Sequence, residues 1–186
     1  SFSCLGSQPY GSAEVRCLVQ LTQDALTTTE SGPFVIACSG GMDSVALFHA
    51  VLQANTGRKL ILATVDHHLH EASAAHTDFV KRVGGESRVE VVILHANPQH
   101  IHNGPGIEAG ARRERYRLLE AFAGQRSAAC ILTAHSADDQ AETLLMRLEQ
   151  SAGLRGMRGI LPQRPGVVRP WLMVSRNRIY AWAMEQ

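Results

Sequence analysis

A short segment with two glycines, two serines and a carboxylate, SGGMDS at residues 39–44, directly follows the apolar run Phe34–Cys38. An apolar run that breaks at paired glycines and then resumes is typical of a strand, a tight loop and a helix. Glycines let the backbone approach an anion closely, and the first N–H groups of the helix then face that anion. Ser39 and Ser44 add hydroxyl donors, and Asp43 adds a carboxylate that can hold Mg²⁺ against a polyphosphate. An ordinary strand-to-helix turn is the alternative. The P-loop signature is absent, because no Gly-Lys-Ser/Thr follows.

A segment rich in histidine follows the next apolar run. Asp66 and His67 come directly after Leu60–Val65, and His68 and His70 lie just beyond them. No neighbouring carboxyl cluster completes a metal shell around these histidines. A metal site on these histidines is therefore disfavoured. Asp66 is expected either to face a ligand or to cap the next turn.

Three charged side chains recur at helical spacing in the middle of the chain. Glu108, Arg112 and Arg115 stand at i, i+4 and i+7, which places them on one face of a helix with Tyr116 beside them. Guanidinium forks on such a face can stabilise negative charge on a phosphate. A solvated row of ion pairs is the alternative interpretation of the same pattern.

Two adjacent carboxylates follow a histidine near the end of a later apolar run. His135 precedes Asp138 and Asp139, and the helical pattern that begins there places both carboxylates in its first turn. A helix cap needs one carboxylate, so a pair beside a histidine favours metal or substrate binding. Coordination of Mg²⁺ together with Asp43 and recognition of an incoming amine both fit this arrangement.

These groups need a scaffold that brings them together. Apolar runs alternate with helical patterns along the chain, which predicts an α/β fold with a mainly parallel five-stranded sheet and helices on both faces. Ligands of such sheets bind beyond the carboxyl ends of the strands, so the glycine loop, Asp66 and the His135–Asp139 segment are expected to converge there. The expected strands are Phe34–Cys38, Leu60–Val65, Val89–Leu94, Ala129–Thr133 and Val167–Leu172.

Helices are expected in the segments between and around these strands. Gly84-Gly85 is expected to close one of them, and residues 95–106, rich in His, Asn, Pro and Gly, are expected to form a loop. The remaining predicted helices cover residues 11–30, a segment that ends near residue 55, and residues 73–83, 107–123, 137–148 and 176–184.

Composition bounds the class of protein. The 186 residues are 45% hydrophobic and 19% charged, which fits one globular domain, and no apolar run approaches the roughly 20 residues that span a bilayer. Four scattered cysteines, with no CxxC pair, indicate buried thiols rather than a zinc or iron–sulfur scaffold. Residues 1–111 carry a net charge of −4 and residues 112–186 one of +5. The arginine-rich second half either meets RNA or reflects genomic base composition.

The motifs taken together resemble those of the tRNA(Ile)-lysidine synthetase family, within the PP-loop ATP pyrophosphatases. The matching segments are SGGMDS at 39–44, VDHHLH at 65–70, EAGARRERY at 108–116, TAHSADDQAET at 133–143 and GLRGM at 153–157. The resemblance spans about residues 34–180, with His70 standing where the family usually has Arg. It implies nucleotide contacts from Ser39, Gly40, Gly41, Met42, Asp43, Ser44, Asp66, His67 and His135. It implies catalytic roles for Asp43, Arg112, Asp138 and Asp139, Mg²⁺ ligands in Asp43 and Asp139, and RNA or substrate contacts from Glu108, Arg115, Tyr116, Arg155 and Arg158.

The resemblance also implies a reaction. ATP would adenylate C2 of the wobble cytidine of a tRNA(Ile) with a CAU anticodon, and free L-lysine would displace AMP to form lysidine, with ATP and Mg²⁺ as cofactors. The protein is expected in the cytoplasm, without contact to a membrane. A homodimer and a monomer remain alternatives for its oligomeric state. Residues 1–30 are expected to be a leader and helix, and 31–186 the catalytic domain, without the family's C-terminal tRNA-binding domains. A thiolating tRNA-modifying enzyme and a non-catalytic nucleotide-binding module remain alternatives.

Overall fold

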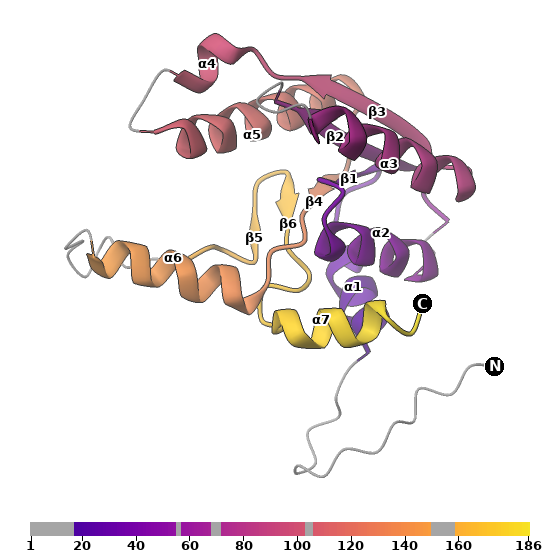
Figure 1. Cartoon of the computed structure of the whole chain (residues 1–186). Coiled ribbons are helices and arrows are strands. Elements are labelled where there is room, and N and C mark those ends of the chain that lie inside the picture. The colour runs from indigo at the N-terminus through magenta and orange to yellow at the C-terminus, as the bar shows by residue number, and fades with distance from the viewer. Residues whose placement is uncertain (1–16, 55–56, 68–71, 103–105, 150–158) are drawn as a thin grey trace.

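A six-stranded sheet forms the centre of the computed structural model, which describes residues 17–54, 57–67, 72–102, 106–149 and 159–186 (Figure 1). The strand order is β3-β2-β1-β4-β6-β5, and every neighbouring pair is parallel except β5 with β6. The α/β class and the mainly parallel sheet are therefore confirmed. The strands are β1 Phe34–Ala37, β2 Leu60–Asp66, β3 Glu90–His95, β4 Cys130–Leu132, β5 Gln163–Arg164 and β6 Val167–Val168.

The sheet has six strands rather than the expected five because β5 and β6 form a small hairpin at its edge. Gly166, in the turn between them, has a φ of +73°, a conformation that glycine adopts without steric cost. Each of these strands has two residues, too few to show the alternation that identifies a strand from sequence.

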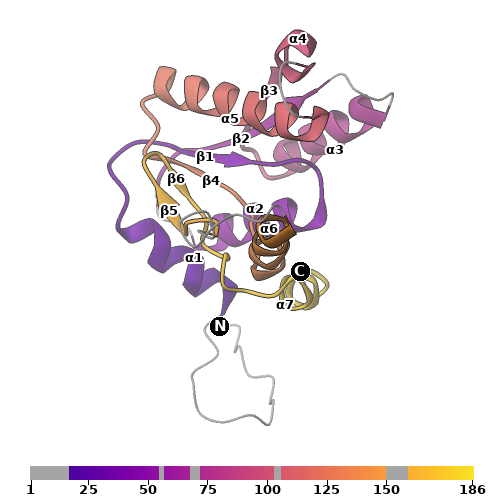
Figure 2. The same ribbon diagram turned by 90° about the vertical axis from the view of Figure 1, so that its left-hand side faces the viewer.

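Helices cover both faces of the sheet, because successive residues of each strand point to opposite sides. Phe34 and Ile36 pack with α1, α2, α3 and α7, whereas Val35 packs with α5. Figure 2 shows α5 on one side of the strands and α1, α2 and α7 on the other. The helices are α1 Leu18–Thr27, α2 Met42–Ala54, α3 Ala72–Glu86, α4 Pro98–His102, α5 Ile107–Gln125, α6 Ala137–Glu149 and α7 Arg176–Ala183.

Two helices depart from the sequence-based expectation, each at a glycine that allows a close approach. α3 does not stop at Gly84-Gly85 but runs to Glu86. A Cβ on Gly84 would lie 2.1 Å from Val91 of β3, so glycine here serves packing rather than termination. The expected loop 95–106 contains the five-residue helix α4, and a Cβ on Gly110 of α5 would lie 1.8 Å from a backbone oxygen of α4.

α1 belongs to the same core as the sheet. Leu18 and Leu26 are each 2% exposed and pack in the cluster that contains Phe34. Trp171, between β6 and α7, is fully buried and donates its indole N–H to Thr22 Oγ1 at 3.0 Å. This bond joins the first described helix to the last part of the chain. None of the helices in the described part of the chain is long and apolar enough to cross a membrane.

Candidate functional site

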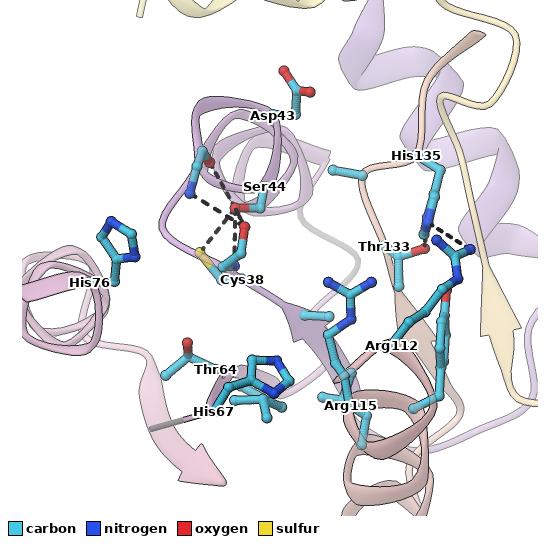
Figure 3. A pocket seen from close by; sticks show the side chains of 18 of the residues that line it. Cys38, Asp43, Ser44, Thr64, His67, His76, Arg112, Arg115, Thr133 and His135 are labelled. Atoms are coloured by element: carbon cyan, nitrogen blue, oxygen red, sulfur yellow. Dashed lines mark hydrogen bonds between the residues drawn. The ribbon is translucent and has the colours of Figure 1, made fainter. Parts of the chain in front are cut away.

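A cavity of about 670 Å³ opens at the carboxyl ends of β1, β2 and β4 (Figure 3). The glycine loop that follows β1 forms one wall, and α5 forms the wall opposite. The convergence expected from the sequence is therefore present for most of the predicted site residues. The polar and charged side chains that line the cavity are Ser39, Asp43, Ser44, Thr64, His67, His76, Thr77, Arg112, Arg115, Tyr116, Thr133, His135, Asp139 and Arg176.

Hydrogen bonds within the glycine loop hold it in one shape before any ligand arrives. Ser44 Oγ donates to the Gly41 carbonyl at 2.7 Å and accepts the backbone N–H of Ser39 at 3.2 Å. Gly40 has a φ of +81°, which disfavours any side chain there. The loop leads directly into α2, which begins at Met42, so the first N–H groups of this helix point to the cavity side of the loop.

Asp43, Asp139 and the guanidinium of Arg176 line one end of the cavity. We call these residues the acid end, together with Glu142, which lies outside the lining but contacts the same guanidinium. Arg176 Nε lies 3.3 Å from Asp43 Oδ2, its Nη2 3.3 Å from Asp139 Oδ1, and its Nη1 3.7 Å from Glu142 Oε1. One cation thus bridges three carboxylates that come from α2 and α6. Arg176 was not among the residues predicted from the sequence.

The two adjacent aspartates at the start of α6 face different partners. Asp139 lines the cavity, and its Oδ2 accepts the backbone N–H and the hydroxyl of Ser136, both at 2.7 Å. Asp138 does not line it; its Oδ2 accepts the backbone N–H of Arg176 at 2.7 Å, at the start of α7. Asp138 therefore positions the helix that carries Arg176, and Asp139 is the member of the pair that a ligand can reach.

Asp43 has an unusual environment for a carboxylate. Its Oδ1 is buried and has no hydrogen-bond partner. Burial raises the pKa of Asp43 above its ordinary value, although the charge of Arg176 acts in the opposite direction. The pKa of Asp139 is lowered instead, since the hydrogen bonds from Ser136 and nearby positive charge outweigh the effect of burial. An orphaned carboxylate oxygen beside a second carboxylate fits Mg²⁺, which takes one or two carboxylates together with phosphate oxygens.

The opposite end, which we call the arginine end, consists of Arg112 and Arg115 of α5 with His135. Figure 3 shows Arg112 reaching to His135 and Arg115 lying beside His67. Within the described ranges, neither guanidinium forms an ion pair with a carboxylate. Burial lowers the pKa of Arg115, and the neighbouring charge of Arg112 lowers it further. Two cations thus face the cavity without an opposite charge, which is the arrangement that an anionic ligand completes.

His135 is held as a neutral imidazole at this end. Burial and the charges of Arg112 and Arg169 lower the pKa of His135 to about 4. Arg112 Nη2 lies 3.5 Å from His135 Nε2, and Thr133 Oγ1 lies 2.9 Å from His135 Nδ1. Since a guanidinium can only donate, we assign Nε2 as the acceptor and place the proton on Nδ1, facing Thr133.

His67 lines the cavity as predicted, and its Nδ1 is buried without a hydrogen-bond partner. Its pKa is lowered, first by burial and then by the charge of Arg115. Thr64, His76 and Thr77 also line the cavity, and sequence reasoning missed all three. The two α3 residues belong to a helix that lies beside the glycine loop, a proximity that no local pattern reveals.

Several predicted site residues lie elsewhere. Asp66, Gly40 and Asp138 do not line the cavity, and Glu108 is exposed in the first turn of α5 without joining Arg112 and Arg115 there. Arg155, Arg158, His68 and His70 fall outside the described residues.

Comparisons with known proteins agree with the motifs. The model of a family described as "PP-loop domain" matches residues 14–186. A tRNA(Ile)-lysidine synthase from Salinispora tropica is 42% identical over 161 residues, which are 82% of this chain and 47% of that protein. The synthase of the same name from Salinispora arenicola is 39% identical over 90% of this chain and 52% of that protein. The resemblance read from the sequence is therefore confirmed. The chain spans about half the length of these curated relatives.

Solved structures with low sequence identity share the fold. A U34-tRNA thiolase from Methanococcus maripaludis has a TM-score of 0.73 at 14% identity, covering 90% of this chain and 62% of its own. An NH₃-dependent NAD synthetase from Campylobacter jejuni has a TM-score of 0.61 at 15% identity, covering 90% of this chain and 69% of its own. At such identities the likeness concerns architecture alone, because one fold hosts many reactions.

Proposed function

Because the chain belongs to the PP-loop domain family, we propose that it is the ATP-using part of an enzyme that forms lysidine on tRNA. In this reaction the C2 oxygen of a wobble cytidine attacks the α-phosphorus of ATP, and pyrophosphate leaves. The ε-amine of free lysine then attacks C2, AMP leaves, and a proton of the amine is lost. The relatives named tRNA(Ile)-lysidine synthase support this choice of substrates.

The observation that carries the proposal is the separation of charge along one cavity. The glycine loop and the acid end suit a polyphosphate with its metal ion, whereas the arginine end presents two guanidinium groups that no carboxylate of the described segments pairs with. The glycine loop and the acid end would hold the charge of the polyphosphate and its metal ion. Arg112 would stabilise the negative charge that develops at the attacked centre, and both groups are in place before the reaction.

Asp43 and Asp139 would hold Mg²⁺, and the ion would neutralise the charge of the pyrophosphate leaving group. The N–H groups at the start of α2 would bind the same phosphates, since this helix end carries partial positive charge. Asp139, which a ligand can reach from the cavity, would also orient the amine of lysine, and Arg112 would stabilise negative charge near the activated oxygen.

No protein nucleophile is needed for these steps. Cys38 and Cys130 are 2% and 3% exposed, and burial raises both thiol pKa values, that of Cys130 to about 12. Thiols of this kind do not supply a thiolate at neutral pH. This observation favours lysidine formation over the sulfur-transfer alternative. The proposed reaction also implies the cytoplasm, where tRNA, ATP and free lysine occur together.

The test is pyrophosphate release from ATP by this chain with tRNA(Ile) alone, lysine alone and both. We expect release to depend on tRNA, and lysidine to appear only with both. ATP binding without release under any condition would favour the non-catalytic module. A sulfur-containing product in the presence of a sulfur donor would establish the thiolating alternative.

A further inference from the structure

A second groove of about 410 Å³ lies between α5 and β5, next to the cavity. Its lining consists of Arg112, Arg113, Tyr116, Arg117, Glu120 and Arg164, which we call the arginine groove. Arg112 and Tyr116 also line the first cavity, so these two side chains form the wall between the two spaces. A ligand in the groove would therefore reach the side chains that face ATP in the cavity.

Arginines outnumber carboxylates in the lining of the arginine groove. Arg164 Nη2 lies 2.6 Å from Glu120 Oε1, and Arg117 Nε lies 2.7 Å from Glu114 Oε2 behind the groove. The groove lining nonetheless has four arginines and one glutamate. The Arg117 and Arg164 side chains are 53% and 34% exposed, so their outer N–H groups remain accessible to a ligand.

Tyr116 gives the groove an aromatic centre surrounded by guanidinium groups. Arg164 lies 4.9 Å from the centroid of the Tyr116 ring, and Arg112 lies 5.8 Å from it. Arg169, which is 6% exposed, donates to the Tyr116 hydroxyl at 3.1 Å and fixes the ring. A rigid aromatic side chain among arginines suits single-stranded RNA, whose phosphates take guanidinium forks and whose bases stack on rings and guanidinium planes.

We propose that the arginine groove binds the RNA backbone beside the base that reacts, so that the base passes Tyr116 and Arg112 into the cavity. This inference rests on the proposed function, which names the RNA but no surface for it. Arg113, Arg117 and Arg164 contact phosphates, and the shared wall sets the distance between those phosphates and the reacting base. An acidic protein segment is the competing occupant, and displacement of the RNA by polyglutamate in the test below distinguishes the two.

The test compares two variants with the same change of charge. Arg113→Glu with Arg164→Glu alters the arginine groove and spares Arg117, which holds the buried Glu114. Lys81→Glu with Arg82→Glu alters exposed positions on α3, which packs on the other face of the sheet. Filter binding of a tRNA(Ile) transcript with a CAU anticodon, repeated over a salt series, gives the affinity and its salt dependence.

We expect the groove variant to bind this RNA at least ~10-fold more weakly, with a salt slope smaller by about two, since each lost phosphate contact reduces the slope by about one. ATP affinity should stay unchanged, and the α3 variant should bind RNA almost as the parent does. Equal RNA affinities for the two variants would overturn the proposal. So would displacement of the RNA by polyglutamate at lower concentration than by unlabelled RNA.

A chemical change in the RNA tests whether the groove binds the phosphates next to the reacting base. Replacing the phosphates that flank the wobble cytidine by methylphosphonates removes their charge, and it should weaken binding to the parent chain but not to the groove variant. Equal losses for both proteins would overturn the proposal. Lysidine assays separate this outcome from the proposed function. If RNA binding depends on the groove but no lysidine forms, the groove proposal is supported and the proposed reaction is contradicted. If lysidine forms but RNA binding does not depend on the groove, the reaction is supported and the groove proposal is contradicted.

Discussion

The two ends of the cavity treat charge in opposite ways. At the acid end, the three carboxylates of Asp43, Asp139 and Glu142 share the guanidinium of Arg176. At the arginine end, Arg112 and Arg115 face the cavity, and within the described ranges they pair with no carboxylate. The protein itself neutralises the acid end only in part, because one guanidinium faces three carboxylates. The arginine end is left for a ligand to neutralise.

This difference separates what the charged side chains cost the stability of the fold from what they contribute to catalysis. Unpaired charge that is partly buried, as at Arg115, costs stability, and the structure keeps it where an anion is to arrive. Paired charge costs less, but the pairing must be exchanged when a metal ion binds. The acid end is therefore expected to respond to Mg²⁺, and the arginine end to the nucleotide and its products.

The largest expected effect concerns Asp43. Asp43→Asn should lower ATP turnover by roughly 10³-fold or more, as removal of a charged group that acts on the leaving group does. It should leave the melting temperature unchanged or raise it, because burial disfavours the Asp43 carboxylate in the folded chain. Pyrophosphate release and thermal melts check both parts, with Asp78→Asn on the exposed side of α3 as control. Normal turnover by Asp43→Asn would contradict the assignment of the acid end.

A smaller effect is expected at the opposite end. Arg112→Ala should lower pyrophosphate release by about 10²-fold to 10³-fold, the usual cost of losing one preorganised donor. Arg112→Lys should recover only part of this loss, since an ammonium cannot form the fork that a guanidinium provides. Thermal stability should change little, because Arg112 is exposed. A fall in melting temperature that accounts for the lost rate would show that the arginine end is a structural feature.

Arg176 tests how much of the negative charge at the acid end the protein itself offsets. Arg176→Met should lower the free energy of unfolding by about 1–2 kcal/mol, since it leaves neighbouring carboxylates without their shared cation. Millimolar Mg²⁺ should then raise the melting temperature of this variant more than that of the parent, because the ion replaces the lost charge. Arg178→Met, two residues on in α7, serves as the control. Equal Mg²⁺ responses of parent and Arg176→Met would mean that the ion binds elsewhere.

The effect that is smallest at neutral pH is the pH dependence that His135 adds, because it develops only in acid solution. Its pKa is about 4 in the folded chain and about 6.5 when unfolded. Below about pH 6.5 the unfolded chain therefore takes up a proton that the folded chain refuses, and the free energy of unfolding falls until about pH 4. The slope is at most about 1.4 kcal/mol per pH unit, and partial exposure reduces it. His135→Asn should remove this slope in denaturant titrations between pH 4 and 7, and an unaltered slope would assign it to another group.

Sequence reasoning succeeded where chemistry follows a strand end. The SGGMDS loop, His67, His135 and Asp139 lie at the ends of β1, β2 and β4, and all of them contribute to the cavity. Apolar runs of four or more residues revealed these strands, whereas the two-residue β5 and the five-residue α4 are too short to show a period.

Arg176 could not be found in this way, because its role depends on the meeting of α7 and α6. The hydrogen bond from its backbone N–H to Asp138 joins residues 38 positions apart. Asp138 and Asp139 were both predicted to be catalytic, and only the fold shows that the Asp138 carboxylate holds α7 while that of Asp139 faces the cavity. Nothing in the local sequence distinguishes the two.

The indole of Trp171 has a consequence for the order in which the chain assembles. It donates a hydrogen bond to Thr22, 149 residues earlier in the chain, and packs in the core beside β1 and α2. This side of the core therefore cannot close until Trp171 has been synthesised. Long-range closure of this kind slows folding and leaves apolar surface exposed meanwhile. The glycine loop, synthesised early, therefore waits for the last segment before its supporting helix is fully covered.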